Sequence, residues 1–395
     1  MKAPAKRRTT TRERRSSLDR RNTRRLSDEI FGDDLHAKRV ESLANGASGV
    51  LRAARLSVHA IGAAYAELAT IRPKHGIKQV DRFLSNHAFD VAKLTPSWAK
   101  FVIGARKELV LALDWTDFED DDHTTLAAYV VTSHGRATPL AWMTVKKSSL
   151  KGRQKDYEYS FIERIHAAIP VEVDIIVLAD RGFGDQKLYA LLEVLGWDYV
   201  IRFRGNILVE NATGETRTAS AWVPASGRAT MLRNVKVTGD KAEVPAVVVK
   251  HAKTMKSPWC LATSLSTKKA SYVVKLYGKR FTIEETFRDQ KDLRFGLGLQ
   301  ATHIADAARR DRLLLLAAIA QALLTLLGAA AEETGLDRAL KANTVKRRTH
   351  SLFRQGSYWY GAISNMREEW LHPLMEAFDR IVSRHAFFTE VFDVI

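Results

Sequence analysis

Two apolar runs of the sequence, each ending in an aspartate, most strongly limit how the chain can fold. The run at residues 109–114 reads Leu-Val-Leu-Ala-Leu-Asp, and the run at residues 174–180 reads Asp-Ile-Ile-Val-Leu-Ala-Asp. Continuous apolar runs of this length are typical of strands that are buried on both faces of a sheet. Because such strands must be covered by helices, the sequence predicts an α/β layer with a mixed sheet.

The order of the elements around these runs narrows the fold further. The predicted elements are strands at 109–114, 125–133 and 137–145, a helix at 157–168, a strand at 174–180, a helix at 185–195 and a strand at 199–204. A turn at His134 and Gly135 joins the second and third strands. Three meandering strands followed by helix, strand, helix and strand is the order of the ribonuclease-H-like fold. We therefore expect an α/β catalytic domain of this kind.

The chain also carries a large positive excess that is concentrated at one end. Its 62 Lys and Arg against 45 Asp and Glu give a formal net charge of +17. Residues 1–25 hold eleven of these cations and two acids, with almost nothing apolar to bury. Such an excess favours a polyanionic partner, with nucleic acid ahead of an acidic membrane. We interpret residues 1–27 as a disordered basic arm that orders on a phosphate backbone; a merely solubilising tail is the alternative.

Several other classes of protein are excluded or disfavoured. The single cysteine, Cys260, excludes an intrachain disulfide and a cysteine zinc site, and it fits a reducing cytoplasm. The phosphate-binding loop of nucleotide hydrolases, the zinc-protease motif and the serine-hydrolase elbow are absent, so no nucleotide cofactor is expected. Residues 313–331 lack charges over the length of a membrane span, but their alanine content and the interior Gln321 favour a buried helix and no membrane partner.

A third notable acid lies in the stretch at residues 277–291. No Pro or Gly interrupts residues 281–293, and the mixture of residues suits a helix. At about 100° per residue, one stripe beside the apolar face is formed by Arg280, Glu284, Arg288 and Lys291. Ordinary intrahelical ion pairs, worth a few tenths of a kcal/mol, would explain this stripe on its own. Its position after Asp114 and Asp180 favours a functional interpretation instead.

Asp114, Asp180 and Glu284 together have the composition of a metal site. A charge at the end of a buried strand is costly without a partner, and the strand ends of open α/β sheets are where ligands bind. Three converging carboxylates repel one another, and Mg²⁺ prefers such oxygen ligands. Two ions would activate an attacking hydroxyl and stabilise the leaving oxygen. The alternative is that each aspartate is only a turn residue.

The same stretch carries a family resemblance. The spacing Y-x2-R-x3-E-x6-K is formed by Tyr277, Arg280, Glu284 and Lys291. It resembles the signature of the insertion-sequence-4 family of bacterial DDE transposases. The resemblance extends to residues 113–116, 179–184, 82–86 and 351–356, and so spans most of the chain from about residue 70 to 356.

This resemblance implies a role for each matching residue. Asp114, Asp180 and Glu284 would be the catalytic triad, with two Mg²⁺ or Mn²⁺ ions as cofactors. DNA phosphates beside the cleavage point would be held by Tyr277, Arg280 and Lys291, and Arg288 on the same stripe is a further expected DNA contact. Family members with a β insertion between the second Asp and the Glu cleave through a DNA hairpin, in which a tryptophan stacks on a flipped base. Trp259 resembles that tryptophan by its surroundings; packing inside the insertion is the alternative.

A second expected DNA contact lies in the helical region before the first strand. A helix following Pro73 has an apolar face, and it presents Lys74, Lys78 and Arg82 elsewhere. A helix that packs on one face and offers cations on another suits binding in a DNA groove, although a solvated helix face has the same pattern.

The expected organisation has six segments. They are the basic arm at 1–27, a helical DNA-binding domain at 28–105, the ribonuclease-H-like catalytic domain at 106–204 and 265–340, a β-strand insertion at 205–264 between its two parts, and a helical C-terminal region at 341–395 with a possible role in dimerisation. The resemblance implies a transposase that binds terminal inverted repeats, excises its element by cut-and-paste through a hairpin and joins it to target DNA. Its partners would be DNA and a second copy of the chain, in the bacterial cytoplasm at the nucleoid. The alternatives are a structure-selective endonuclease of the same fold and a catalytically silent DNA-binding descendant of a transposase.

Overall fold

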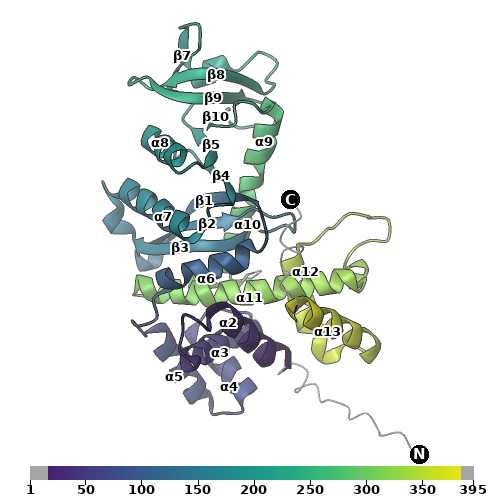
Figure 1. Ribbon diagram of the computed structural model, residues 1–395. Helices are drawn as coiled ribbons and strands as arrows, with labels where there is room; N and C mark the ends of the chain where they lie inside the picture. Colours follow the sequence, from purple (N-terminus) through teal and green to yellow (C-terminus); the bar gives the residue numbers. More distant parts are fainter. Residues whose placement is uncertain (1–16, 295, 384–395) are drawn as a thin grey trace, which may run out of the picture.

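A single mixed sheet of ten strands runs through most of the protein, in the order β3-β2-β1-β4-β5-β10-β9-β8-β6-β7 (Figure 1). The computed structural model describes residues 17–294 and 296–383. The strands are β1 (Glu108–Phe118), β2 (His123–Val130), β3 (Thr138–Lys146), β4 (Asp174–Ala179), β5 (Asp198–Phe203), β6 (Leu208–Glu210), β7 (Thr216–Thr218), β8 (Thr230–Val237), β9 (Ala242–Lys250) and β10 (Trp259–Thr263). The first five strands have the predicted order, and the mixed α/β architecture is consistent with a ribonuclease-H-like domain.

The centre of this sheet is buried on both sides. Strand β1 pairs antiparallel with β2 and parallel with β4, and β4 pairs parallel with β5. Residues 109–113 and 175–179 are almost completely buried, as their unbroken apolar runs predict. Because Leu113 is paired with Ala179, Asp114 and Asp180 follow at the same level of the sheet. The pairing of β1 with β4 therefore brings the two aspartates together.

Helices cover the sheet and continue beyond it. They are α2 (Thr23–Phe31), α3 (Ala37–Ala53), α4 (Val58–Ala69), α5 (Pro73–Leu84), α6 (Val91–Ile103), α7 (Gln154–Ala168), α8 (Gln186–Val194), α9 (Ala270–Gly278), α10 (Thr282–Lys291), α11 (Ala307–Glu333), α12 (Leu352–Ala362) and α13 (Glu368–Ser383). Figure 1 shows the N-terminal helices at one end of the molecule and strands β7 to β10 at the other.

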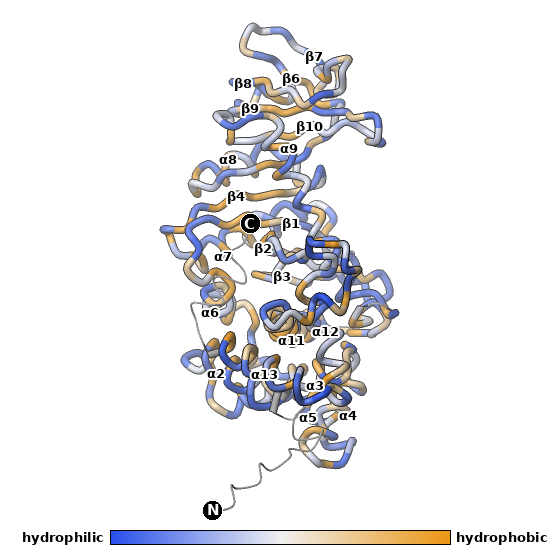
Figure 2. The backbone as a smooth tube through the Cα atoms, turned by 90° about the vertical axis from the view of Figure 1, so that its right-hand side faces the viewer, coloured by the Kyte–Doolittle hydropathy of each residue, from blue (hydrophilic) through white to orange (hydrophobic). Residues whose placement is uncertain are grey.

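The long helix α11 lies between the sheet and the N-terminal helices, with α12 and α13 packed near one end (Figure 1). Its length and composition would allow it to cross a membrane, but 94% of its most apolar window is buried inside the protein. Figure 2 shows long hydrophobic segments in α11 and in β1, β3 and β4. The expectation of a buried helix at 313–331 is therefore confirmed.

Four sequence expectations need correction. Asp114 does not end its strand, because β1 continues to Phe118 by pairing with β2 beyond the end of β4. Residues 1–16 of the expected arm lie outside the described residues, but residues 17–31 are helical and Leu26 is fully buried, so folded chain begins before residue 28. The insertion contains one unexpected short strand, β7. Arg280 precedes α10 in a 3₁₀ turn (Lys279–Phe281), so the charged stripe is not one continuous helix.

Candidate active site

A cavity of about 580 Å³ lies where β1 and β4 meet the start of α10, and we call it the acid cavity. Its lining includes Asp114, Asp180, Glu284, Arg280, Arg288 and Lys291. The structure therefore brings together the three acids that the sequence singled out, along with three of the four DNA contacts expected at residues 277–291. Tyr277 does not line this cavity.

Local backbone contacts hold the first two acids. The amide of Trp115 donates to Oδ1 of Asp114 at 3.0 Å, inside strand β1. Asp180 begins the turn after β4, where its Oδ1 accepts from the amide of Gly182 at 2.8 Å. A Cβ atom on Gly182 would lie 3.0 Å from that same oxygen, so a glycine suits this turn. Each carboxylate retains a second oxygen that its backbone contact does not use.

Arg280 lies between two of the acids. Its Nη1 donates to Oδ2 of Asp114 at 2.9 Å, and its Nη2 donates to Oε1 of Glu284 at 2.6 Å. Only 7% of the Arg280 side chain is exposed, compared with 48% for Glu284. The guanidinium also lies over the ring of Phe281, 5.0 Å from its centre. Arg280 therefore neutralises part of the charge of the acid cavity.

The electrostatics show that the three acids interact. Burial raises the pKa of Asp114 to about 6; Arg280 opposes this rise, and Asp180 and Glu284 reinforce it. Within the described parts of the chain, no three His, Cys, Asp or Glu side chains lie close enough together to hold a metal ion. The three carboxylates are nevertheless the oxygen donors that a hard divalent cation prefers. The chemistry of the donors therefore suits such an ion, while in this structure the Arg280 guanidinium is bonded to both Asp114 and Glu284.

Lys291 and Arg288 are anchored differently. Lys291 donates to the carbonyl of Asp117 at 2.6 Å and to Oγ1 of Thr116 at 3.2 Å, so it ties the end of α10 to β1. Burial lowers the pKa of Lys291. Arg288 is mostly exposed and pairs with Glu285 at 2.8 Å. Arg288 is thus more open to a ligand than Lys291 is.

Trp259 and Tyr277 belong to an aromatic cluster beside Arg280. Trp259 begins β10 and is half-buried, and its ring centre lies 4.9 Å from that of Tyr277 in an edge-to-face contact. Tyr277 is almost fully buried in the last turn of α9. Phe281, which is exposed, lies 6.1 Å from Trp259. The cluster leaves part of Trp259 and Phe281 accessible.

A buried carboxylate that the sequence interpretation missed links the segments that carry Asp114 and Asp180. Glu158 on α7 is fully buried, and its Oε1 accepts from Nε1 of Trp115 at 3.0 Å. Its Oε2 accepts from Nζ of Lys155 at 2.8 Å, and the same Nζ donates to the carbonyl of Gly182 at 2.9 Å. Glu158 therefore connects β1 with the turn that follows β4.

A second missed carboxylate fixes helix α10, which carries Glu284. Asp289 is almost completely buried, pairs with Nε of Arg136 and accepts from Nη2 of Arg354 at 2.8 Å. One turn earlier on α10, Thr286 Oγ1 donates to the carbonyl of Ala137 at 3.0 Å. Helical periodicity put Asp289 off the functional stripe. The one sequence signal for its role was that Arg354 lies in the segment 351–356, which shares the family resemblance.

The basic residues expected on the N-terminal domain lie apart from the acid cavity. Lys74, Lys78 and Arg82 are all exposed on α5. None of them lines the acid cavity, and Arg82 lines a separate cleft in the N-terminal helices.

Comparison with known proteins identifies the family. No curated protein matches the chain. Residues 105–321 match the family described as "Transposase DDE domain". The matched segment begins just before β1, ends within α11 and includes all three acids and Arg280. Since it covers more than half of the sequence, the chain belongs to the DDE transposase family.

Proposed function

We propose that the chain is a cut-and-paste transposase of the insertion-sequence-4 type, which excises an element at its terminal inverted repeats and joins it to target DNA. As a DDE transposase it acts on DNA, and its family generally uses divalent metal ions. The observation that carries the finer proposal is the convergence of Asp114, Asp180 and Glu284 on one cavity beside Arg280. The reaction begins with hydrolysis at the element's end, and the freed 3′-OH then attacks the opposite strand.

In this proposal the three acids would hold two Mg²⁺ or Mn²⁺ ions, which when bound would activate the attacking oxygen and stabilise the leaving one. Arg280 shields Asp114 and Glu284 from each other when the ions are absent. With the charge of the two acids neutralised in another way, the Arg280 guanidinium would be available to a DNA phosphate. Its planar fork matches a phosphate with two parallel hydrogen bonds.

The other expected contacts divide into two groups. Arg288 is exposed at the cavity and would contact phosphate directly, whereas Lys291 would stabilise the DNA from a position fixed against β1. Tyr277 contacts the ring of Trp259 edge to face and would affect DNA binding through Trp259. Trp259 and Phe281 offer the accessible aromatic surface on which an unpaired base of a hairpin intermediate would stack.

The proposal includes a dimer on DNA, since both ends of an element must be held together during excision. The C-terminal region supports this assignment because Tyr358 on α12 and Trp370 on α13 are exposed. The site of action would be the bacterial nucleoid. Light scattering of the protein with and without a DNA end would give the oligomeric state.

The decisive experiment uses the genomic DNA that flanks the gene, end-labelled and incubated with the full-length protein and Mg²⁺. Denaturing gels should show nicked, hairpin and joined products with the wild type and none with Glu284→Gln. Cleavage by Glu284→Gln at the wild-type rate would overturn the assignment of the three acids. Nicking of branched DNA without joining would favour a structure-selective endonuclease. DNA binding without cleavage in Mg²⁺ or Mn²⁺ would favour a silent descendant.

A further inference from the structure

The loop between β3 and α7, residues 147–153, is a basic surface beside the acid cavity, and we call it the β3–α7 loop. No acid occurs in the sequence between Asp122 and Asp156, and the end of this stretch carries Lys146, Lys147, Lys151, Arg153 and Lys155. Of these cations, Lys146, Lys151 and Arg153 are exposed. A run of exposed cations without acids favours a polyanionic partner.

The β3–α7 loop is held in one conformation. Lys147 pairs with Asp117 at 2.9 Å. The amide and the hydroxyl of Ser148 donate to the carboxylate of Asp122 at 2.9 and 2.6 Å. Gly152 has a φ of +73°, which favours glycine, and a Cβ atom there would have nothing within 4 Å. The loop is therefore preformed with an open backbone, and a preformed surface loses little entropy on binding.

Two cations of the loop have side chains that are available to an anion. Within the parts of the chain that the structure describes, the Lys151 side chain makes no hydrogen bond or ion pair. The Arg153 guanidinium lies 5.4 Å from the centre of the Tyr157 ring, a contact that leaves its N–H donors unused. Lys155 is engaged, because it pairs with Glu158 at 2.8 Å. Lys151 and Arg153 are thus the cations that a ligand would meet.

The loop leads to the face of the sheet that lies opposite α10. Asp114 accepts from Arg280, which directly precedes α10, whereas the next residue, Trp115, donates to Glu158 on α7. Neighbouring side chains of a strand point to opposite faces of a sheet, so α7 and α10 cover opposite faces here. The expected phosphate contacts of residues 280–291 therefore lie on one face of this sheet edge, and the β3–α7 loop leads to the other.

The free cations of the loop are close to the three acids. Lys155 donates to the carbonyl of Gly182 at 2.9 Å, and the amide of Gly182 donates to Asp180 at 2.8 Å. Lys151 is only four residues before Lys155, and four residues span at most about 14 Å. A duplex that enters the acid cavity would therefore pass the loop within one helical turn, about 34 Å.

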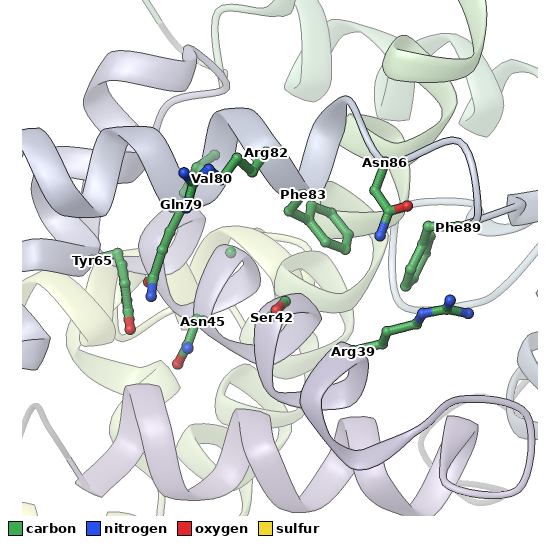
Figure 3. Close-up of a pocket in the computed structure, with 11 residues that line it drawn as sticks. Arg39, Ser42, Asn45, Tyr65, Gln79, Val80, Arg82, Phe83, Asn86 and Phe89 are labelled. Carbon is green, nitrogen blue, oxygen red and sulfur yellow. The ribbon is translucent and has the colours of Figure 1, made fainter.

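A different basic surface lies in the N-terminal helices. Arg39 and Arg82 line a cleft of about 200 Å³ between α3 and α5 (Figure 3). Arg82 is one of the residues expected to bind the element's end, as are Arg280 and Lys291 at the acid cavity. Since these surfaces are assigned to the element's end, the β3–α7 loop is left for the DNA beyond the cleavage point.

We propose that Lys151 and Arg153 of the β3–α7 loop hold the phosphate backbone of duplex DNA outside the element, an inference that rests on the proposed function. Before excision this duplex is the flanking DNA, and during joining it is the target DNA. Both present the same chemistry, a row of phosphates. The contact is independent of base sequence, because the one amide beside these cations, that of Gln154, is bonded to Glu158 at 2.9 Å.

The first arm of the test detects the contact without any chemistry. Full-length protein in EDTA is mixed with a duplex of arbitrary sequence of about 30 base pairs, roughly three turns. Lysines are then acetylated with acetic anhydride and identified by mass spectrometry. The duplex should slow acetylation of Lys151 about fivefold or more. Lys100, an exposed cation on α6, is the control and should react at the same rate with and without DNA.

The second arm measures joining of ends that already carry a free 3′-OH to a supercoiled plasmid in Mg²⁺. The variant Lys151→Ala/Arg153→Ala should need about tenfold more plasmid for half-maximal joining, and Lys151→Glu/Arg153→Glu should need still more. Arg153→Lys should stay within about twofold of the wild type because it keeps the charge. Lys100→Ala is the matched control and should join like the wild type. Thermal unfolding of all variants should be unchanged, since these side chains are exposed.

The third arm distinguishes flanking from target DNA by cleavage of ends with flanks of about 3 and about 20 base pairs. If the loop holds the flank, the wild type should cleave the long-flank end at a lower DNA concentration, and Lys151→Ala/Arg153→Ala should lose this advantage. If the loop holds only the target, flank length should have no effect while joining still weakens in the variant.

The inference is overturned if DNA leaves the acetylation of Lys151 unchanged. It is also overturned if Lys151→Ala/Arg153→Ala joins and cleaves like Lys100→Ala. Failure of the proposed function gives a different result. If no end is cut or joined but the duplex protects Lys151, the DNA contact of the loop stands and the proposed chemistry fails. If ends are cut and joined while Lys151 stays unprotected, only the assignment of the loop fails.

Discussion

Arg280 and Asp114 form an ion pair in which Nη1 lies 2.9 Å from Oδ2, with side chains that are 7% and 18% exposed. The same guanidinium reaches Glu284, so one cation lies between two acids that the sequence separates by 170 positions. A divalent ion held by these acids must compete with that cation. The structure therefore connects metal affinity with the position of one arginine.

Replacing Arg280 by Ala should tighten Mn²⁺ binding. Removing a positive charge that is bonded to two of the expected ligands relieves competition with the ion, and we expect about tenfold higher affinity. DNA cleavage should fall because the phosphate contact is lost. Electron paramagnetic resonance of free Mn²⁺ gives the affinity. The control is Arg288→Ala, whose side chain lines the same cavity but pairs with Glu285. Equal Mn²⁺ affinity in the two variants would contradict this account.

Glu158 should act as a positioning residue. Glu158→Ala leaves the indole of Trp115 without its acceptor and removes the ion pair with Lys155, which keeps the carbonyl of Gly182. We expect a loss of about 2 kcal/mol in the free energy of unfolding, discounted because Lys155 is partly exposed. Glu158→Gln should lose less, since it still accepts from Trp115. Mn²⁺ affinity should fall in both variants while DNA binding in EDTA stays unchanged. Glu163→Ala, an exposed acid on the same helix, is the control.

Asp289 should stabilise the helix that carries Glu284. Its carboxylate is almost completely buried between Arg136 and Arg354, so Asp289→Ala removes the nearest acid from two cations, and Arg136 retains a longer contact of 3.9 Å with Glu285. We expect a loss of about 3 kcal/mol in the free energy of unfolding, measured by urea denaturation. Glu285→Ala removes an acid from the same helix that is 39% exposed, and it should cost less than about 0.5 kcal/mol. Similar losses of stability in Asp289→Ala and Glu285→Ala would show that Asp289 does not anchor the helix.

Gly356 should be irreplaceable in the contact between α11 and α12. A Cβ atom at this position would lie 1.7 Å from the carbonyl oxygen of Leu324, so Gly356→Ala must push the two helices apart. We expect a loss of about 3 kcal/mol or more in the free energy of unfolding. Gly361 is in the same helix with open space around it, and Gly361→Ala should stabilise by about 0.5–1 kcal/mol. Thermal denaturation of the two variants tests whether Gly356→Ala lowers the stability and Gly361→Ala raises it.

His134 should make the fold sensitive to acid. Burial, with Arg348, Arg106 and Arg136 nearby, lowers the pKa of His134 to about 3. Between that value and the unfolded pKa of about 6.5, the unfolded chain binds more protons, so stability falls as the pH falls. From pH 7.5 to pH 5 this loss should be about 2 kcal/mol. In urea denaturation, His134→Gln should lose about 2 kcal/mol less than the wild type over this pH range. An equal dependence of stability on pH in both proteins would contradict the role of His134.

The sequence predicted the parts of the fold and the site that depend on local pattern. Unbroken apolar runs located β1 and β4, and their parallel pairing is why Asp114 and Asp180 meet. The spacing at 277–291 led to Glu284 and Arg280 because a helical period relates them directly. These predictions needed no knowledge of distant partners.

What the sequence did not predict depends on contacts between distant segments. Asp289 has the periodicity of a solvent-facing residue, and only the arrival of Arg136 and Arg354 makes it a buried anchor. Glu158 is likewise buried by Trp115 from a strand 43 positions earlier. The end of β1 was misplaced because β2 continues to pair beyond Asp114, which the apolar pattern of β1 alone does not encode.

The pairing of β5 with β10 has a consequence for how this protein could be rebuilt. Between Phe203 and Cys260, its partner in the antiparallel pair, the chain forms β6 to β9, which are the outer strands of the same sheet. Paired residues of this kind are about 5 Å apart, so a tight turn could replace residues 204–258 and leave β10, with Trp259, as the edge strand. Strands β6 to β9 therefore form an insertion between two strands that are direct neighbours in the sheet. It can be shortened, exchanged or lost without rerouting the chain through the centre that holds the three acids.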